Sequence, residues 1–188
     1  QISREHGVPT ETAYFNRKTV EAYVGERSVK LYNASGVFFH LEELHSVIDG
    51  IQFSLREDGV LIVQFMYAGT MVEKLNFDTI YHEHLCYYTL RSLSNLLAPY
   101  GLEIFDAYYS EIHSGSVIAK ICLSQSPLNS KTSRYLELLE KDKGYTLDAF
   151  KNFAATVRAR QGSLRALLEG IKTSNKTIYA YGAPAKGN

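Results

Sequence analysis

The first half of the chain alternates between short apolar runs and segments with helical spacing. Residues 8–14 and 28–34 are rich in β-branched and aromatic residues and predict strands. The run "GVLIVQF", residues 59–65, is almost entirely apolar, as in a central strand covered on both faces. Helices are predicted at residues 17–24 and 38–55 from apolar residues three or four apart. This alternation indicates parallel strands joined by helices, so we expect an α/β layered fold.

The pattern changes after this strand. Residues 67–88 are polar and are expected to form a loop, and apolar spacing then predicts a helix over 90–100, ended by Gly101. Two further strands are predicted at 102–109 and 116–124. The segment that joins them is short, which favours antiparallel pairing. We therefore expect the parallel sheet to finish in an antiparallel hairpin.

From residue 125 the chain has a different composition, with a Ser- and Pro-containing linker and then two predicted helices. The longer helix, 146–171, has an apolar stripe that we expect to pack in the core and between domains. Residues 176–188, "KTIYAYGAPAKGN", predict a strand that enters a glycine-bounded loop. We divide the chain into residues 1–124 and residues 125–188, the latter being linking helices and the start of a second α/β domain.

Composition excludes several classes of function. Twenty basic residues balance twenty acidic ones, so the chain lacks the basic excess typical of binding to nucleic acids or anionic membranes. The apolar runs are too short to cross a bilayer, and the start has no secretory signal pattern. A cytoplasmic protein is therefore expected. The two cysteines, Cys86 and Cys122, form no C-x-x-C pair, and no metal site is expected in this chain.

The stretch "NFDTIYHEHLCYY", residues 76–88, concentrates side chains that can carry chemistry. His82 and His84 are two residues apart, so a metal between them is one interpretation, although zinc needs three or four ligands. Ordinary histidines with satisfied hydrogen bonds are a second. Acid/base chemistry is a third, because Tyr81 and Glu83 add a phenol and a carboxylate to the two imidazoles.

The same stretch opens a longer resemblance. "FDTIYHEHLCYYTL", "YGLEIFD" and "HSGS" resemble, in this order, the hallmark region of the sugar C-methyltransferases that depend on S-adenosylmethionine (SAM). "SGVFFHLEELH" and "YAYGAPAKGN" resemble two further motifs of that family, so the resemblance runs over essentially the whole chain. One departure is Ser114, where family members commonly have a second glycine.

The resemblance implies a three-part enzyme with an N-terminal zinc-binding domain, a central Rossmann-like SAM domain and a C-terminal α/β domain. This chain, which starts at Gln1, would be an internal fragment holding the second half of the class I methyltransferase sheet and the start of the third part. Zinc is then expected only in the missing N-terminal domain. Because the glycine-rich SAM loop would also lie upstream, we expect the fragment itself to be inactive.

The implied reaction is methylation of a carbon next to the ketone of a nucleotide-linked keto-deoxysugar. Such a reaction needs a base and a hydrogen-bond donor for the enolate oxygen. By resemblance the base is His84, oriented by Glu83, with Tyr81 as the donor and His40 facing the same cleft. His82 is expected to be non-essential.

Binding residues are also implied, because ligands of open parallel sheets lie at the carboxyl ends of the strands. Ser35 and Gly36 are the expected SAM contacts. The expected substrate contacts come from the "HSGS" loop and from "GAPAKG", whose glycines and lysine suit a phosphate; they are His113, Ser116, Gly182, Lys186 and Gly187.

Two other functions fit the same pattern. A methyltransferase of this fold acting on another acceptor, for example at oxygen, would need less from the "YHEH" motif. A nucleotide-sugar or NAD-type binding module would need none of its acid/base chemistry.

Overall fold

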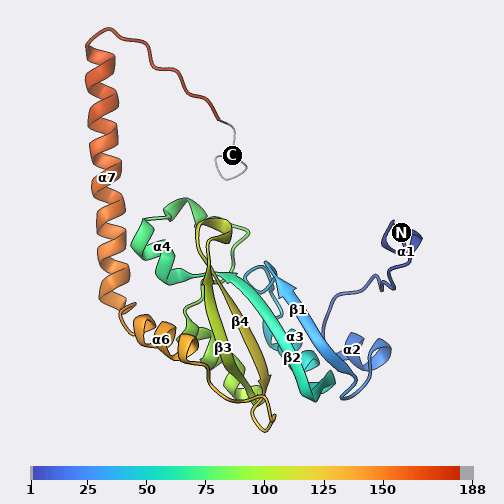
Figure 1. Ribbon diagram of the computed structural model, residues 1–188. Helices are drawn as coiled ribbons and strands as arrows, with labels where there is room; N and C mark the ends of the chain where they lie inside the picture. The colour runs from blue at the N-terminus through green and yellow to red at the C-terminus, as the bar shows by residue number, and fades with distance from the viewer. Residues whose placement is uncertain (1, 183–188) are drawn as a thin grey trace.

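A mixed sheet of four strands forms the centre of the molecule (Figure 1). The computed structural model describes residues 2–182. The strands are β1 (Val29–Ser35), β2 (Leu55–Met66), β3 (Leu102–Ser110) and β4 (Ser116–Leu123), in the order β1-β2-β4-β3. β1 and β2 are parallel, whereas β4 runs antiparallel to both of its neighbours. The α/β class and the closing antiparallel hairpin are both confirmed.

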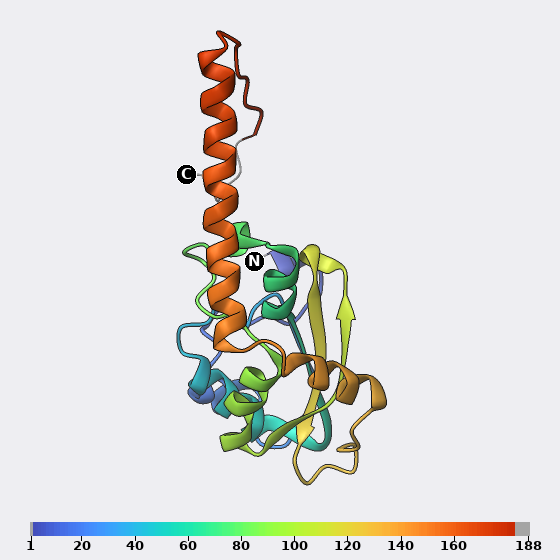
Figure 2. The same ribbon diagram turned by 90° about the vertical axis from the view of Figure 1, so that its left-hand side faces the viewer.

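The helices alternate with the strands in the first half and follow them in the second (Figures 1 and 2). Short 3₁₀ turns lie at Phe77–Thr79, Ala98–Tyr100 and Ile112–Ser114. The α-helices are α1 (Ile2–Glu5), α2 (Arg17–Tyr23), α3 (Leu44–Ser54), α4 (Ala68–Lys74), α5 (Leu90–Leu97), α6 (Ser133–Asp142) and α7 (Leu147–Thr173).

The core lies between the sheet and the helices α3 and α5. Ile48 of α3, Leu93 of α5 and Phe65 and Ile121 of the sheet are fully buried in one apolar cluster. Burial of such side chains stabilises a fold by about 1.5–3 kcal/mol each. The apolar residues three or four apart in the sequence are therefore those that α3 and α5 pack against the sheet.

The expected helix over 38–55 begins later than the spacing suggests. Phe38 and Phe39 are buried, but their backbone forms a turn rather than a helix, and α3 starts only at Leu44. β2 runs without interruption through residues 57–59, where its pairing register with β1 shifts. A side chain at Gly59 would lie 2.9 Å from the carbonyl oxygen of Val29, which explains the glycine.

Three other predictions were wrong in detail. Residues 8–14 form no strand, and neither do the described residues 176–182, because neither segment has a neighbouring strand to bond with. The expected loop 67–88 contains α4. Apolar residues in α4 pack against neighbouring elements and stabilise a helix that the polar composition of the segment conceals.

The long helix α7 projects away from the sheet (Figures 1 and 2). Its apolar stripe, expected to be buried, is buried only at Phe153, whereas Leu147, Leu164 and Leu167 are 57–70% exposed. The described part of the chain contains no helix that is both long and apolar enough to cross a membrane.

Candidate active site

A cavity of about 400 Å³ lies where the parallel strands β1 and β2 end. Gly36, directly after β1, and Met66, the last residue of β2, form its base. The segment 78–84 and the β3–β4 loop supply two of its walls. The cavity therefore lies at the strand ends where open α/β sheets bind ligands.

His84 is held by a main-chain atom. Its Nδ1 lies 2.8 Å from the carbonyl oxygen of Thr79. A carbonyl oxygen only accepts hydrogen bonds, so Nδ1 carries the proton and Nε2 is the basic nitrogen of the neutral ring. The ring packs against Phe39 and Tyr81, at centroid distances of 4.8 and 4.2 Å, and lines the cavity. This arrangement suits a general base.

His40 lies beside His84 and is held in the same way. Its Nδ1 is 2.6 Å from the carbonyl oxygen of Glu83, and the centroids of the two imidazoles are 5.1 Å apart. Both rings line the cavity together with Tyr81. The structure thus brings together three of the four expected catalytic residues.

Glu83 has a different place from the one expected. Its carboxylate is 60% exposed and lies 4.0 Å from Nε2 of its neighbour His82, which is 80% exposed. Glu83 does not line the cavity. The group that fixes Nδ1 of His84 is therefore the carbonyl of Thr79, not the side chain of Glu83. Glu83 contributes to the site through its main-chain carbonyl, which holds His40.

The Thr79 carbonyl has a second donor, the Tyr87 hydroxyl, at 3.2 Å. Burial raises the pKa of Tyr87, so the phenol keeps its proton and remains a donor. Neither residue was singled out from the sequence. No sequence signal identifies a main-chain acceptor, whereas Asp78, which also lines the cavity, stands in the "FDTIYHEH" motif and could have been selected from it.

The β3–β4 loop brings His113 and Ser114 to the cavity wall in an unusual backbone conformation. His113, Ser114 and Gly115 have φ angles of 53°, 64° and 132°. A side chain at Gly115 would lie 2.4 Å from a carbon of Thr70. Left-handed conformations of non-glycine residues are costly and cluster at functional sites. His113, an expected substrate contact, lines the cavity.

Ser116 does not reach the cavity, contrary to expectation. Its side chain is completely buried, its hydroxyl accepts from Gln64 Nε2 at 2.7 Å and it donates to the Ile112 carbonyl at 2.8 Å. Both bonds are internal, so the residue stabilises the loop rather than binding a substrate. The main-chain carbonyl of Gln64 accepts from the N–H of Gly36 at 3.1 Å. Gln64 therefore links the end of β1 to this loop.

The expected cofactor contacts separate into one that fits and one that does not. Gly36 lines the cavity and has a φ of 66°. Because glycine has no Cβ, it leaves space at the end of β1. The hydroxyl of Ser35 is bonded to the side chain of Asn33 at 2.9 Å, and the residue does not line the cavity. Within the described residues, Gly36 and Met66 are the residues at the ends of β1 and β2 that line the cavity.

Of the remaining expected contacts, only Gly182 is described, and it does not line the cavity. Gly182 is exposed, at the end of the described chain, and Lys186 and Gly187 lie outside the described residues. Among residues 2–182, no three or more His, Cys, Asp or Glu residues are grouped so that they could hold a metal ion.

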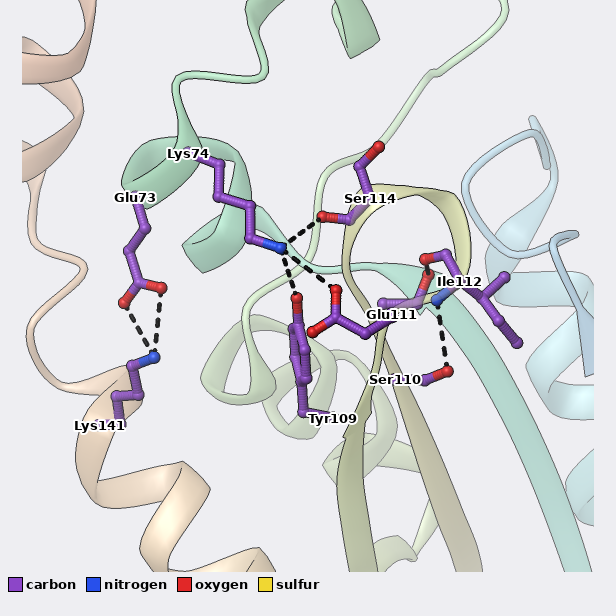
Figure 3. Close-up of polar contacts among 9 residues, drawn as sticks. Glu73, Lys74, Tyr109, Ser110, Glu111, Ile112, Ser114 and Lys141 are labelled. Atoms are coloured by element: carbon purple, nitrogen blue, oxygen red, sulfur yellow. Dashed lines mark hydrogen bonds and ion pairs between the residues drawn. The ribbon is translucent and has the colours of Figure 1, made fainter.

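Lys74, the last residue of α4, fastens the β3–β4 loop from outside the cavity (Figure 3). Its Nζ donates to the Tyr109 hydroxyl at 3.0 Å and to the Ser114 carbonyl at 3.3 Å, and lies 3.4 Å from the Glu111 carboxylate. The bond to Tyr109, followed by the pairing with Glu111, raises the pKa of Lys74. The lysine therefore stays charged around neutral pH.

Comparison with known proteins shows which sequences this chain resembles. Residues 111–188 match the sequence profile of the C-methyltransferase C-terminal domain. The whole chain is 27% identical, over 191 residues, to the C-methyltransferase NovU of Streptomyces niveus. In sequence, the chain is therefore similar to C-methyltransferases. It spans 45% of the length of that relative.

Solved structures show partial likeness, with TM-scores below 0.5. The PH0226 protein of Pyrococcus horikoshii OT3 has a TM-score of 0.48 at 9% identity, over 65% of this chain and 63% of that one. The magnesium protoporphyrin IX methyltransferase of Synechocystis PCC 6803, with bound SAH, has a TM-score of 0.38 at 19% identity, over 53% and 47% of the two chains.

Proposed function

We propose that the protein containing this chain transfers a methyl group from SAM to a carbon next to the ketone of a nucleotide-linked keto-deoxysugar. The relationship to the C-methyltransferases supports methylation at carbon. The observation that carries the mechanism is the bond from His84 to the Thr79 carbonyl, which makes Nε2 the basic nitrogen at the cavity wall.

In the proposed reaction, His84 Nε2 removes a proton from the carbon beside the ketone. The electron pair of that C–H bond forms the enolate, whose negative charge rests mainly on the former ketone oxygen. Tyr81, in ring contact with His84 and at the cavity wall, donates a hydrogen bond to this oxygen. When bound, SAM would supply an electrophilic methyl group: the enolate carbon would bond to this methyl as the methyl–sulfur bond breaks, and S-adenosylhomocysteine would leave with that electron pair. His40, whose ring centroid lies 5.1 Å from that of His84, lines the same cavity beside the base.

Other residues of the proposal bind rather than react. Gly36 leaves room for the cofactor at the end of β1, and His113 contributes the wall on the acceptor side. By the resemblance of "GAPAKG" to the family motif, Gly182, Lys186 and Gly187 remain expected contacts of the nucleotide part.

The test compares His84→Ala with His82→Ala in the complete protein. His82 stands two residues away in the same segment and is 80% exposed, which makes it a matched control. We expect His84→Ala to lower kcat by about 10²–10⁴-fold and to abolish solvent deuterium exchange of the substrate's α-proton, because general-base catalysis contributes that much. His82→Ala should retain both.

Two outcomes would contradict the proposal. α-Proton exchange that persists in His84→Ala would remove His84 as the base. An O-methyl product, identified by NMR, would show that the acceptor atom is oxygen and that no enolate is needed.

A further inference from the structure

The loop that carries His113 does not hold its shape through its own strands alone. Three consecutive residues, 113–115, have positive φ angles, and His113 and Ser114 are exposed. A loop of this conformation relaxes unless its surroundings hold it in place. Since two of its residues line the cavity, the groups that hold the loop also determine the width of the cavity.

Lys74 supplies contacts on both sides of this loop. Its Nζ reaches the Ser114 carbonyl within the loop, the Tyr109 hydroxyl on β3 and the Glu111 carboxylate between them (Figure 3). The three acceptors surround the ammonium group, whose three protons can each serve one of them. Lys74 itself does not line the cavity.

The position of Lys74 in the chain connects this loop to the base. α4 begins two residues after Met66 of the cavity base, and Lys74 comes five residues before Thr79, whose carbonyl fixes His84. Leu75, directly after the helix, has a left-handed backbone and turns the chain toward that segment. A displacement of α4 relative to the loop therefore changes the separation between His113 and His84.

We propose that Lys74 is a positioning residue, which holds the β3–β4 loop against α4 and so sets the spacing between His113 and the His84 segment. The proposal rests on the proposed function for its catalytic consequence, and on geometry alone for the anchoring. Its bond to Ser114 acts on the main chain, and its bond to Tyr109 fixes the strand from which the loop emerges.

The experiment compares Lys74→Met with Lys141→Met. Lys141 is a matched control, because it is a similarly exposed lysine that pairs with Glu73 of the same helix at 2.9 Å but does not touch the loop (Figure 3). Hydrogen exchange is measured on peptides covering 108–118, and kcat and KM for the acceptor are measured in the complete protein. Thermal unfolding midpoints show whether each variant is folded.

We expect Lys74→Met to speed exchange in the loop about tenfold and to raise KM for the acceptor more than it lowers kcat, with a total loss in kcat/KM of about 10- to 100-fold, since small misplacements have effects of this size. Lys141→Met should change neither. Tyr109→Phe, which removes one acceptor and keeps the ring, should show an intermediate effect on both.

Unchanged loop exchange in Lys74→Met would overturn the proposal, whatever the activity. Faster loop exchange with unchanged kcat and KM in an active enzyme would also overturn it. If the wild-type protein forms no C-methyl product, the proposed function fails, and loop exchange then decides by itself whether Lys74 anchors the loop. A variant with a lowered unfolding midpoint is replaced by Tyr109→Phe, judged by the same two measurements.

Discussion

At the scale of single residues, main-chain atoms do much of the work that the sequence suggested for side chains. The carbonyl of Thr79 fixes the tautomer of His84, and that of Glu83 holds His40. Both histidines could be selected from the sequence, but their partners could not. A main-chain carbonyl is present at every residue, so only the fold determines which one meets an imidazole.

A second example at this scale is Asp106, whose carboxylate is buried and surrounded by cations. It accepts from Thr132 at 2.7 Å and pairs with Arg134 and, at 3.1 Å, with Lys120. The bond to Arg134 is the main reason why the pKa of Asp106 is far below its usual value of 3.8. Its stabilising contribution is therefore complete above about pH 3.8 and is lost as the pH falls through the folded-state pKa.

We predict that Asp106→Asn lowers the free energy of unfolding at pH 7 by about 2–4 kcal/mol, because a paired buried charge is removed and its cations lose their partner. The measurement is urea denaturation at several pH values. The difference from the wild type should shrink as the pH falls below 3.8. Asp58→Asn is the control, since Asp58 pairs with Lys30 on the surface and should contribute little.

A difference between Asp106→Asn and the wild type that stays constant from pH 7 to below pH 3.8 would contradict this linkage. So would an equally large effect of Asp58→Asn.

At the scale of elements, α5 is stabilised at its start by two separate groups. Thr89 and Ser92 form a reciprocal capping box. Asp142, the buried last residue of α6, accepts from the N–H groups of Leu90 and Arg91, both at 3.0 Å. The capping box is formed by residues three apart and can be predicted from the sequence. Asp142 lies about 50 residues away in the chain, so its role as a cap cannot be predicted in this way.

Asp142 also accepts from the hydroxyl of Tyr67 at 2.7 Å. Burial and this bond raise the pKa of Tyr67. We predict that Asp142→Ala lowers the free energy of unfolding by about 3–5 kcal/mol, because two buried donors and one partly buried donor lose their acceptor. Thr89→Ala should lower it by about 1 kcal/mol, the usual effect of one cap. Chemical denaturation measures both.

The comparison tests which cap matters more. If Thr89→Ala were the more destabilising change, the buried Asp142 would not be the main acceptor at the start of α5.

At the scale of the whole molecule, the central sheet and α7 have different relations to solvent. Most apolar side chains of β2, β3 and β4 are buried. In contrast, α7 extends away from the sheet, and most of its leucines are exposed (Figures 1 and 2). Phe153 is 8% exposed and is the buried residue of this helix. Packing to the rest of the described chain is thus confined to the first part of α7.

We predict that Phe153→Ala lowers the free energy of unfolding of this chain by about 3 kcal/mol, as expected for the loss of a buried aromatic ring. Leu164→Ala and Leu167→Ala, at residues that are 57% and 59% exposed, should each change it by less than about 0.5 kcal/mol. Thermal or urea unfolding measures all three. A large loss in either leucine variant would show that the stripe is packed in solution.

The sequence by itself determined the elements of the sheet and most of the residues at the cavity. Apolar spacing identified α3, α5 and the four strands, because burial against a sheet imposes that spacing. The motif around Tyr81 and His84 and the loop at His113 were selected correctly as cavity residues. Local chemistry and local periodicity are properties that a sequence contains directly.

Only the tertiary structure decided which atoms meet. It shows that Ser116 and Ser35, expected binding residues, do not line the cavity. It also shows the contacts by which Lys74 anchors the β3–β4 loop. It also assigned the orientation of His84 to Thr79 rather than to Glu83. These outcomes depend on distances between segments far apart in the chain, or on main-chain atoms that all residues share. The physical reason is that hydrogen bonding and packing depend on positions in space, which residue type and local spacing do not specify.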